Sequence, residues 1–240
     1  MSGSAMMILD SDAVRPGRKD DMDGANLGDI EAYVEALFIE RDPALDLALL
    51  DAEEAGLPEI QVSALQGRLL YLIAALSGAR RILEIGTLGG YSGIHFARAL
   101  PETGRLITLE LSEKHAAVAL GNFRRAGLSG RVEVRVGDAK KTLRNMIHSG
   151  EEPFDLVFID AEKEGYIEYL DLALRLSRVG TVVIADNAIR GGAVLDPDSG
   201  YGRVMDRFNR RFAAHERLEG TILPMLRRSV DGMVVGRVVG

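Results

Sequence analysis

The sequence predicts an α/β fold built on a doubly wound, mostly parallel sheet of seven strands, with helices ahead of it. Beyond Gly78, short apolar segments alternate with amphipathic segments, which is the pattern of βαβ units. The short segments are apolar at successive positions, as expected for parallel strands that helices cover on both faces. Two further apolar segments follow a glycine-rich stretch near the end of the chain, and they bring the expected strands from five to seven.

The order of these elements can be placed by residue range. The five central strands are expected at 81–85, 105–110, 132–136, 154–160 and 181–186. Helices are expected between and after them at 92–100, 114–126, 143–149 and 165–176. A glycine-rich loop at 190–202 is expected to lead into a helix at 204–217 and two late strands at 218–223 and 233–239.

The first 77 residues are expected to divide into an arm and a group of helices. Residues 1–28 have no apolar period, so they bury too little surface to offset the entropy of ordering, and we expect a disordered arm. From Asp29 onward apolar residues recur at helical spacing, which predicts helices within 29–77. We therefore expect one domain at 29–240, with its α/β core at 78–240.

Composition excludes several classes of protein. Of 240 residues, 47% are hydrophobic and 27% are charged, which is the balance of a globular chain. The 29 Lys and Arg against 36 Asp and Glu give a net charge of -7, the wrong sign for binding nucleic acid. The sequence has no cysteine, which excludes disulfides, cysteine-bound zinc and a thiol nucleophile and fits a cytoplasmic protein. No apolar stretch approaches the roughly 20 residues of a membrane span, and the start is too acidic for a signal peptide.

Acidic residues stand at the ends of four of the five central strands. They are Glu110, Asp138, Asp160 and Asp186. Ligands of open α/β sheets bind beyond the carboxyl ends of the strands, so these side chains are expected at one crevice. Each of them alone could simply cap the following helix. Four at one edge instead indicate a binding site.

The first strand ends in a glycine turn, residues 86–90, that does not match the common nucleotide motifs. It lacks G-x-G-x-x-G because Leu88 and Tyr91 occupy the positions that need glycine, and it lacks the Gly-Lys of a P-loop. The turn better suits a small ligand with an amino acid group, whose ammonium Glu84 could bind and whose carboxylate Ser92 could bind. Glu110 would then accept hydrogen bonds from the hydroxyls of a ribose.

Several motifs in this order resemble one enzyme family. They are residues 83–92, 108–110, 136–139, 154–163 with Tyr166, and 185–187. The stretch from about residue 64 to 235 resembles the cation-dependent class I O-methyltransferases, the group of catechol and caffeoyl-CoA O-methyltransferases, which use S-adenosylmethionine. The resemblance implies a Rossmann-like fold, a homodimer and a small aromatic diol as substrate.

The resemblance also implies roles for particular residues. Those expected to face the cofactor are Glu84, Gly86, Ser92, Glu110, Asp138 and Asp160. Those expected to hold the metal are Asp160, Asp186 and Asn187, and Lys163 is expected to act as the base.

The chemistry of the three expected metal ligands also favours a divalent-cation site. Asp160, Asp186 and Asn187 offer oxygen ligands only, which favours Mg²⁺, or another hard cation such as Ca²⁺, over zinc. An octahedral ion with three protein ligands keeps about three positions, enough for a water and two adjacent oxygens of a substrate. A vicinal diol on an aromatic ring fits these positions.

Some features depart from the family or leave alternatives open. The chain reads Arg178-Val179-Gly180 where relatives usually carry Pro-Gly-Gly, it has no tryptophan, and neither the first 60 residues nor the 188–203 loop matches the family. The alternatives are a catalytically silent, cofactor-binding dimeric partner and a methyltransferase with another acceptor. None of the histidines is spaced as a metal ligand, although His95 follows the cofactor turn closely enough to face the pocket.

Overall fold

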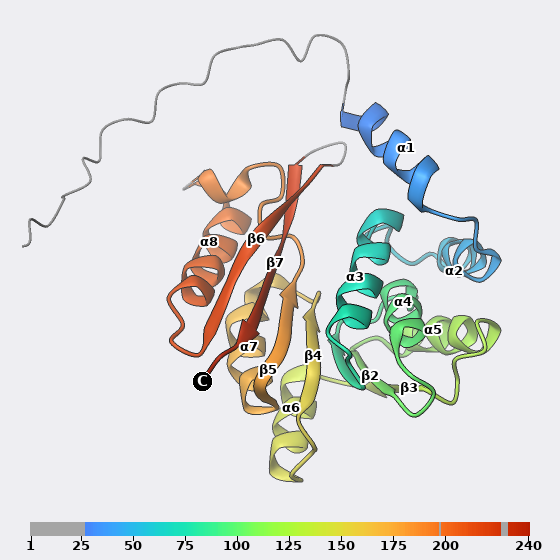
Figure 1. Ribbon diagram of the computed structural model, residues 1–240. Helices are drawn as coiled ribbons and strands as arrows, with labels where there is room; N and C mark the ends of the chain where they lie inside the picture. Colours follow the sequence, from blue (N-terminus) through green and yellow to red (C-terminus); the bar gives the residue numbers. More distant parts are fainter. Residues whose placement is uncertain (1–26, 197, 227–229) are drawn as a thin grey trace, which may run out of the picture.

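A computed structural model describes residues 27–196, 198–226 and 230–240 (Figure 1). Its centre is a seven-stranded sheet in the order β3-β2-β1-β4-β5-β7-β6. The strands are β1 (Arg81–Ile85), β2 (Arg105–Glu110), β3 (Val132–Val136), β4 (Phe154–Ile159), β5 (Ser177–Ala185), β6 (Leu218–Leu226) and β7 (Val230–Val238). The strands β1 to β5 pair in parallel, whereas β7 is antiparallel to β5 and to β6. The predicted doubly wound, mostly parallel sheet is confirmed.

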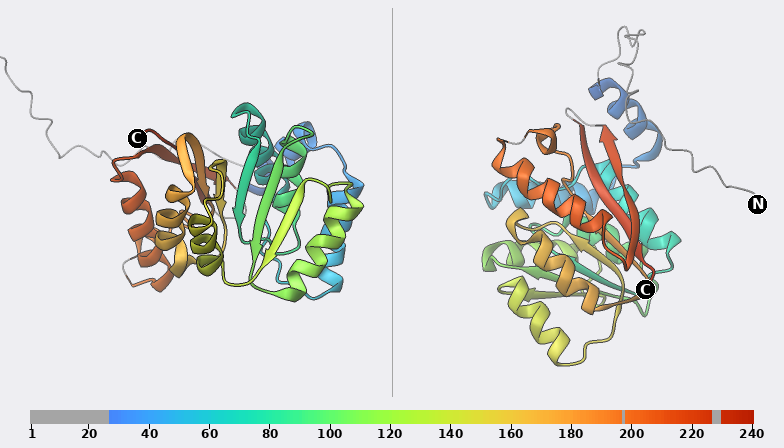
Figure 2. Two further views of the ribbon diagram at one scale, coloured as in Figure 1. Left: turned by 90° about the horizontal axis from the view of Figure 1, so that it is seen from below. Right: turned by 90° about the vertical axis from the view of Figure 1, so that its left-hand side faces the viewer.

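Helices cover both faces of this sheet (Figure 2). They are α1 (Leu27–Phe38), α2 (Pro43–Glu54), α3 (Ala64–Leu76), α4 (Tyr91–Ala99), α5 (Glu113–Arg125), α6 (Ala139–His148), α7 (Tyr166–Arg175) and α8 (Gly200–Ala213), with short 3-10 turns η1 (Lys163–Gly165) and η2 (Ala193–Leu195). Successive residues of a strand point to opposite faces of the sheet and belong to two hydrophobic clusters. Ile82 packs in the cluster with α3, α4 and α5, and Leu83 packs in the cluster with α6, α7 and α8. Burial on both faces explains why the strands are apolar at successive positions.

Three elements start four residues earlier than expected, each for a local reason. The strand β5 starts at Ser177 rather than 181, because the pairing with β4 shifts register after Phe154, where the Thr181 hydroxyl donates to the Phe154 carbonyl at 2.6 Å. The helix α6 starts at Ala139 because the Asp138 carboxylate caps it, accepting from the Lys141 N–H at 2.8 Å. The helix α8 starts at Gly200, four residues early, because Ser199 caps it in the same way.

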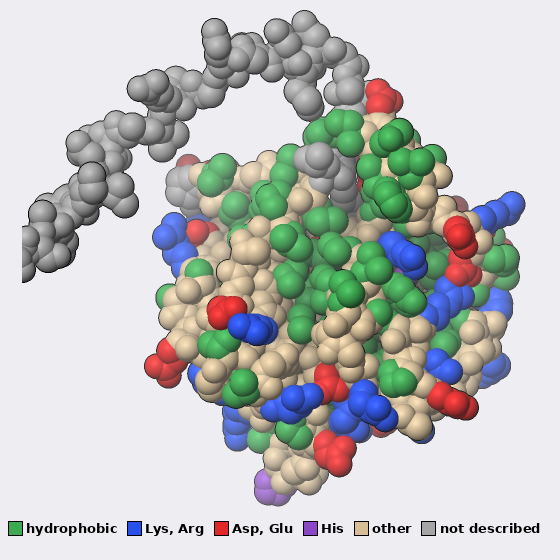
Figure 3. Space-filling view, in the orientation of Figure 1, with side chains coloured by type: hydrophobic (Ala, Val, Ile, Leu, Met, Phe, Trp, Pro, Cys, Tyr) green, Lys and Arg blue, Asp and Glu red, His purple; other side chains and the backbone are tan. Residues whose placement is uncertain are grey.

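The first two helices lie outside the α/β unit, whereas α3 packs on the sheet beside α4. The helix α2 packs on α4 and α5, whereas α1 lies at the periphery and has no buried residue (Figure 1). Tyr33, Leu37 and Phe38 of α1 are 67%, 58% and 64% exposed, and Figure 3 shows hydrophobic side chains gathered there. The helix begins at Leu27, two residues before the expected limit of the arm, and residues 1–26 lie outside the described residues. Among the described residues, no helix combines the length and apolar character that a membrane span requires.

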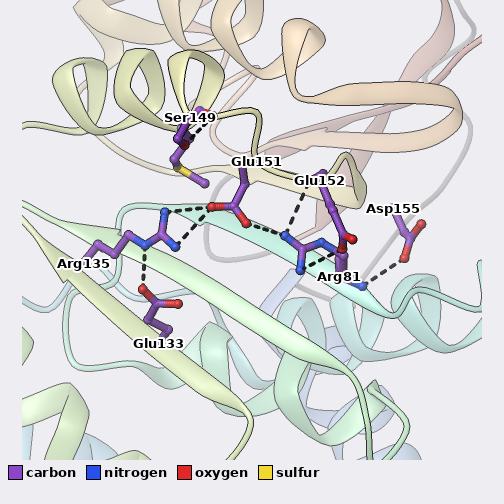
Figure 4. Close-up of polar contacts among 8 residues, drawn as sticks. Arg81, Glu133, Arg135, Ser149, Glu151, Glu152 and Asp155 are labelled. Atoms are coloured by element: carbon purple, nitrogen blue, oxygen red, sulfur yellow. Dashed lines mark hydrogen bonds and ion pairs between the residues drawn. The ribbon is translucent and has the colours of Figure 1, made fainter.

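A group of charged side chains links β1, β3 and the segment between α6 and β4 (Figure 4). The Glu151 carboxylate accepts from Arg81 at 2.7 Å and from Arg135 at 3.3 Å, and Arg135 also donates to Glu133 at 2.7 Å. Nearby, burial alone would raise the pKa of Asp155, but hydrogen bonds from the backbone N–H groups of residues 80 and 81, and from Arg178, lower it. Glu151 is therefore the shared acceptor of two partly buried guanidinium groups.

Removing this shared acceptor should destabilise the fold. We expect Glu151→Ala to lower the free energy of unfolding by about 1–2 kcal/mol, because it removes the acceptor that two partly buried guanidinium groups share. The matched control is Glu152→Ala, whose carboxylate is 79% exposed and lies 3.7 Å from Arg81. Urea titration should show a loss below about 0.5 kcal/mol for this control. Equal losses in the two variants would contradict the role of Glu151.

Candidate active site

A cavity of about 600 Å³ lies beyond the carboxyl ends of the parallel strands. Its walls come from the glycine turn after β1, the loop after β4, the starts of α5 and α6, and helix α2 with the segment that follows it. Of the nine residues predicted to act in the site, Gly86, Ser92, Glu110, Asp138, Asp160, Lys163 and Asn187 line the cavity. Glu84 and Asp186 do not line it, and both are almost fully buried.

The glycine turn is shaped by close approach to β4. Gly86 has φ +100°, and a Cβ atom there would lie 2.1 Å from the carbonyl oxygen of Asp160. Gly90, at the start of α4, has φ +83°, and its Cβ would lie 2.9 Å from the Phe123 ring. Leu88 also adopts a positive φ of 49°, which is uncommon for a non-glycine residue. Glycine at 86 thus lets the end of β1 lie directly beside Asp160.

Glu110 connects the end of β2 to this turn. Its Oε2 accepts from the backbone N–H groups of Thr87 at 3.2 Å and Leu88 at 2.9 Å, and its Oε1 accepts from Ser112 at 2.9 Å. His115 Nδ1 lies 3.4 Å from Oε1. The carboxylate therefore stands on the cavity wall in a fixed orientation. Its role as the ribose acceptor stays a prediction.

Glu84 lies behind Ser92 rather than on the wall. Its side chain is fully buried and accepts from the Ser92 hydroxyl at 2.6 Å and the Thr108 hydroxyl at 2.7 Å. Burial raises the pKa of Glu84 to about 7, although both hydroxyls oppose the shift. In this arrangement Glu84 orients Ser92, which faces the cavity. Direct contact of Glu84 with the cofactor stays a prediction.

The raised pKa makes a pH-dependent prediction. The pKa of Glu84 in the folded state lies above its unfolded value of 4.5, so the folded state binds the proton more tightly. The contribution of Glu84 to the free energy of unfolding is therefore fully present below pH 4.5 and is lost as the pH rises through about 7. Glu84→Gln removes the titration. From pH 5 to pH 8, its free energy of unfolding relative to wild type should rise by on the order of 2 kcal/mol, measured by urea titration at both pH values. A difference that stays constant with pH would contradict the burial of an ionisable group here.

The residues predicted to hold a metal follow two neighbouring strands. Ile159 of β4 is in register with Ala185 of β5, so Asp160 and Asp186 come together at the sheet edge. Burial, and then the Asp160 charge, raise the pKa of Asp186 to about 7. Asn187 adopts φ 59° and donates through Nδ2 to Asp231 at 3.2 Å.

The oxygen atoms of Asp160, Asp186 and Asn187 are the candidate ligands of a cation. Within residues 27–196, 198–226 and 230–240, no group of three or more Asp, Glu or His side chains is arranged to hold a metal. Asp160 and Asp186 instead form a pair of carboxylates, and the amide of Asn187 supplies the third candidate oxygen. Two carboxylates close enough for one to raise the pKa of the other form a site that a hard cation would stabilise.

Lys163 lies beside the first of these carboxylates. Its Nζ is 3.0 Å from Asp160 Oδ1 and 2.6 Å from the Tyr166 hydroxyl, and its side chain is 14% exposed. Tyr166 is fully buried and donates to the carbonyl of Ile159 at 3.1 Å. Lys163 begins the 3-10 turn η1, so the i,i+3 contact with Asp160 arises in a turn. The Lys163 amine is fixed at the cavity by two oxygen partners.

Two residues of the site were not predicted. Gln66 is fully buried and donates through Nε2 to Asp186 at 3.3 Å, while its backbone and side chain form a capping box with Ser63. The Ser-x-x-Gln spacing is a sequence signal for such a cap. Asp231 accepts from Asn187, and also from the backbone N–H groups of Ile189 and Arg190. No sequence signal marks Asp231, because the antiparallel return of β7 brings it to the site.

His95 has a structural environment. It is 9% exposed, does not line the cavity and stacks edge-on with Tyr91 at 5.2 Å between ring centres. A Cβ at Gly67 would lie 2.4 Å from its Nε2, so α3 and α4 meet closely at this point. Burial lowers the pKa of His95 to about 4. His95 is thus a packed, neutral residue and does not face the pocket.

The chain is similar to known O-methyltransferases. A family model described as O-methyltransferase matches residues 40–238. A protein of Niastella koreensis named catechol O-methyltransferase is 48% identical over 212 residues, covering 87% of this chain and 96% of that protein. An O-methyltransferase from Bacillus cereus, solved in complex with SAH, has a TM-score of 0.85 at 43% identity and covers 88% of this chain and 98% of its own.

A second solved structure gives the same result. The O-methyltransferase TomG from Streptomyces achromogenes, described as involved in tomaymycin synthesis and solved in complex with SAM, has a TM-score of 0.84 at 41% identity. It covers 89% of this chain and 97% of its own. The family model spans the sheet, the glycine turn and the Asp160–Lys163 region. The chain belongs to the O-methyltransferase family.

Proposed function

We propose that the protein transfers the methyl group of S-adenosylmethionine to one hydroxyl of a vicinal diol on an aromatic ring, with a divalent cation such as Mg²⁺ at the site. The observation that carries the proposal is that one cavity joins the glycine turn and Glu110 to Asp160, Lys163 and Asn187. The SAM and SAH complexes of similar structures support the cofactor. The name catechol O-methyltransferase, given to relatives at 48% and 43% identity, supports the acceptor class.

The cofactor half of the cavity suits S-adenosylmethionine. The methionine carboxylate can bind at the start of α4, where the backbone N–H groups of Tyr91 and Ser92 favour an anion, while the Ser92 hydroxyl donates to Glu84. Glu110 can accept hydrogen bonds from the two ribose hydroxyls, and Asp138 lies on the same wall. A divalent cation would be held by Asp160, Asp186 and Asn187, whose oxygens are the ligands that Mg²⁺ prefers.

The proposed chemistry is an in-line displacement. When bound, S-adenosylmethionine supplies a methyl group on a positively charged sulfur, and a divalent cation supplies charge that favours an ionised oxygen. The cavity holds the acceptor so that one hydroxyl faces the methyl carbon. A neutral Lys163 amine can donate to Asp160 and Tyr166 and still accept the proton of that hydroxyl through its lone pair. The oxygen–carbon bond then forms as the carbon–sulfur bond breaks, and the electron pair stays on sulfur.

Two alternatives make different predictions. A silent partner protein would bind the cofactor without turnover, and the intact set of Asp160, Lys163 and Asn187 at the cavity argues against it. A methyltransferase with another acceptor would bind the cofactor and methylate compounds that lack a vicinal diol. Both retain the cofactor site, so the acceptor screen separates them from the proposed function.

Calorimetry and an acceptor screen test the proposal. S-adenosylhomocysteine should bind, and NADH should give no heat beyond that of buffer. With labelled S-adenosylmethionine, catechols, caffeoyl esters and flavonoid diols should be methylated, whereas matched phenols with one hydroxyl should not. Cofactor binding without methylation of any diol would contradict the proposed reaction.

Glu110 offers a direct test of the cofactor half. We expect Glu110→Ala to weaken binding of S-adenosylmethionine by roughly 1.5–3 kcal/mol, because it removes a charged acceptor of hydrogen bonds. Calorimetry gives the affinity, and Glu113→Ala, an exposed acid at the start of α5, is the matched control. Unchanged affinity in Glu110→Ala would overturn the ribose assignment.

We also propose that the protein is a cytoplasmic homodimer. The resemblance to the O-methyltransferases implies a homodimer, and the exposed apolar side chains of α1 offer a surface for a second copy. Light scattering at micromolar concentration should give twice the 26.0 kDa chain mass. A monomer mass would contradict the proposal.

A further inference from the structure

We infer that Arg190 makes the acceptor pocket selective for diols whose aromatic ring carries a negatively charged substituent, such as a carboxylate. The inference rests on the proposed function and adds the chemical class of the acceptor. Arg190 lies in the loop between β5 and α8, three residues after Asn187, and lines the cavity.

A side-chain contact and a backbone hydrogen bond hold Arg190 in the loop. Its guanidinium carbon lies 4.5 Å above the centre of the Tyr201 ring, and the Tyr201 hydroxyl donates to the carbonyl of Asn187 at 3.0 Å. The backbone N–H of Arg190 donates to Asp231 at 2.8 Å. Tyr201 therefore contacts both the Arg190 guanidinium and Asn187, a residue expected to help hold the diol.

The loop that carries Arg190 packs closely against the start of α8. A Cβ at Gly202 would lie 1.9 Å from the carbonyl oxygen of Ala193, so glycine is needed where the loop and α8 meet. Tyr201 is the neighbouring residue, and Ser199 caps the helix just before it. The packing holds the Tyr201 ring in place, and Arg190 stacks on that ring.

The balance of charge at the cavity distinguishes Arg190 from the other basic groups. Among the described residues, the basic side chains that line the cavity are His115, Lys163 and Arg190. Lys163 is paired with Asp160, and His115 lies beside Glu110. The Arg190 side chain makes no ion pair with any acid in the described part of the chain. Its charge is therefore available to a ligand.

The chemistry of the guanidinium selects the ligand class. A guanidinium has five N–H donors, and the hydrogen bond between Arg190 and Tyr201 uses only part of them. The planar geometry of the remaining donors matches the two oxygens of a carboxylate. Asp231 does not compete for this edge, because its oxygens already accept from Asn187 and from three backbone N–H groups, including that of Gly232. A carboxylate on the far side of the ring from the diol would neutralise Arg190.

Three acceptors with one ring and different charges test the inference. They are 3,4-dihydroxyphenylacetate, its methyl ester and 3,4-dihydroxyphenethylamine. Wild type should show a kcat/KM for the carboxylate about 10-fold or more above that for the ester, as expected for a charge-assisted hydrogen bond. Arg190→Ala should lower kcat/KM for the carboxylate by about 10-fold and for the ester by less than about 3-fold. Arg190→Glu should favour the amine.

The matched control is Arg68→Ala. Arg68 is also exposed and stacked on a tyrosine, with its guanidinium carbon 5.0 Å from the centre of the Tyr71 ring, but it does not line the cavity. This variant should leave the preference unchanged. Calorimetry in the presence of S-adenosylhomocysteine should show the same loss of carboxylate affinity in Arg190→Ala.

Two results would overturn the inference. One is equal kcat/KM for carboxylate and ester in wild type, and the other is an equal loss for both in Arg190→Ala. If none of the three acceptors is methylated although another diol of the acceptor screen is, the inference is overturned and the proposed function stands. If no diol is methylated, the proposed function itself fails. Equal methylation of all three would overturn the selectivity alone.

Discussion

Asp160→Ala is expected to abolish cation-dependent methyl transfer. The carboxylate stands at the end of β4, beside Asp186 and at the cavity, and it is the oxygen partner of Lys163 at 3.0 Å. Its removal takes away one of three candidate oxygen ligands and one of the two oxygen partners of Lys163. The rate of methylation should fall to that of the reaction without added metal, measured with labelled S-adenosylmethionine.

A binding measurement separates this effect from a loss of fold. Calorimetric titration with Mg²⁺ should show no binding to Asp160→Ala, while thermal melting should show a cooperative transition. Asp171→Ala is the control, because its carboxylate lies on α7 and pairs with Arg211 away from the cavity. Metal-dependent turnover that persists in Asp160→Ala would show that Asp160 is not a ligand.

Lys163→Ala is expected to lower kcat by roughly 10²–10⁴, the usual range for loss of a general base. Lys163 Nζ is held by Asp160 and Tyr166, so it is oriented before substrate arrives. The buried Tyr166 ring and its bond to the Ile159 carbonyl remain in the variant, so we expect the fold to persist. The change should appear in kcat, with little effect on affinity for S-adenosylhomocysteine.

Lys140 provides the matched control for Lys163. Its Nζ lies 3.5 Å from Glu162 in the same region, but it does not line the cavity. Lys140→Ala should change kcat by less than about 3-fold, as expected for a lysine outside the reacting groups. Raising the pH should partly restore the rate of Lys163→Ala, because hydroxide can take the proton that the lysine would have taken. Equal kcat in Lys163→Ala and wild type would exclude the lysine as the base.

The sheet could be predicted because its signals are local. Each parallel strand is a short apolar segment between amphipathic ones, and the acids that follow β2, β3, β4 and β5 are fixed by the sequence itself. The sequence alone shows that the glycine turn does not match a dinucleotide-binding motif, because Leu88 occupies a position where G-x-G-x-x-G requires glycine. The structure adds that Gly86 is needed there for close approach to Asp160.

Other parts of the site could not be predicted because they depend on tertiary contacts. Glu84 was expected at the cofactor, but its orientation toward Ser92 and Thr108 follows from packing between β1 and β2. Asp231 reaches Asn187 only through the antiparallel pairing of β5 with β7. The stacking of Arg190 on Tyr201 depends on the fold of a loop that matched no family pattern.

The dependence of catechol methylation on a divalent cation separates the proposed reaction from methyl transfer without metal. The protein is treated with EDTA, dialysed and assayed with a catechol and labelled S-adenosylmethionine, first without metal and then with Mg²⁺ added back. The proposed reaction requires that methylation stops without metal, returns with Mg²⁺ and places one methyl group on one of the two adjacent oxygens. Methylation at the full rate in EDTA would contradict it.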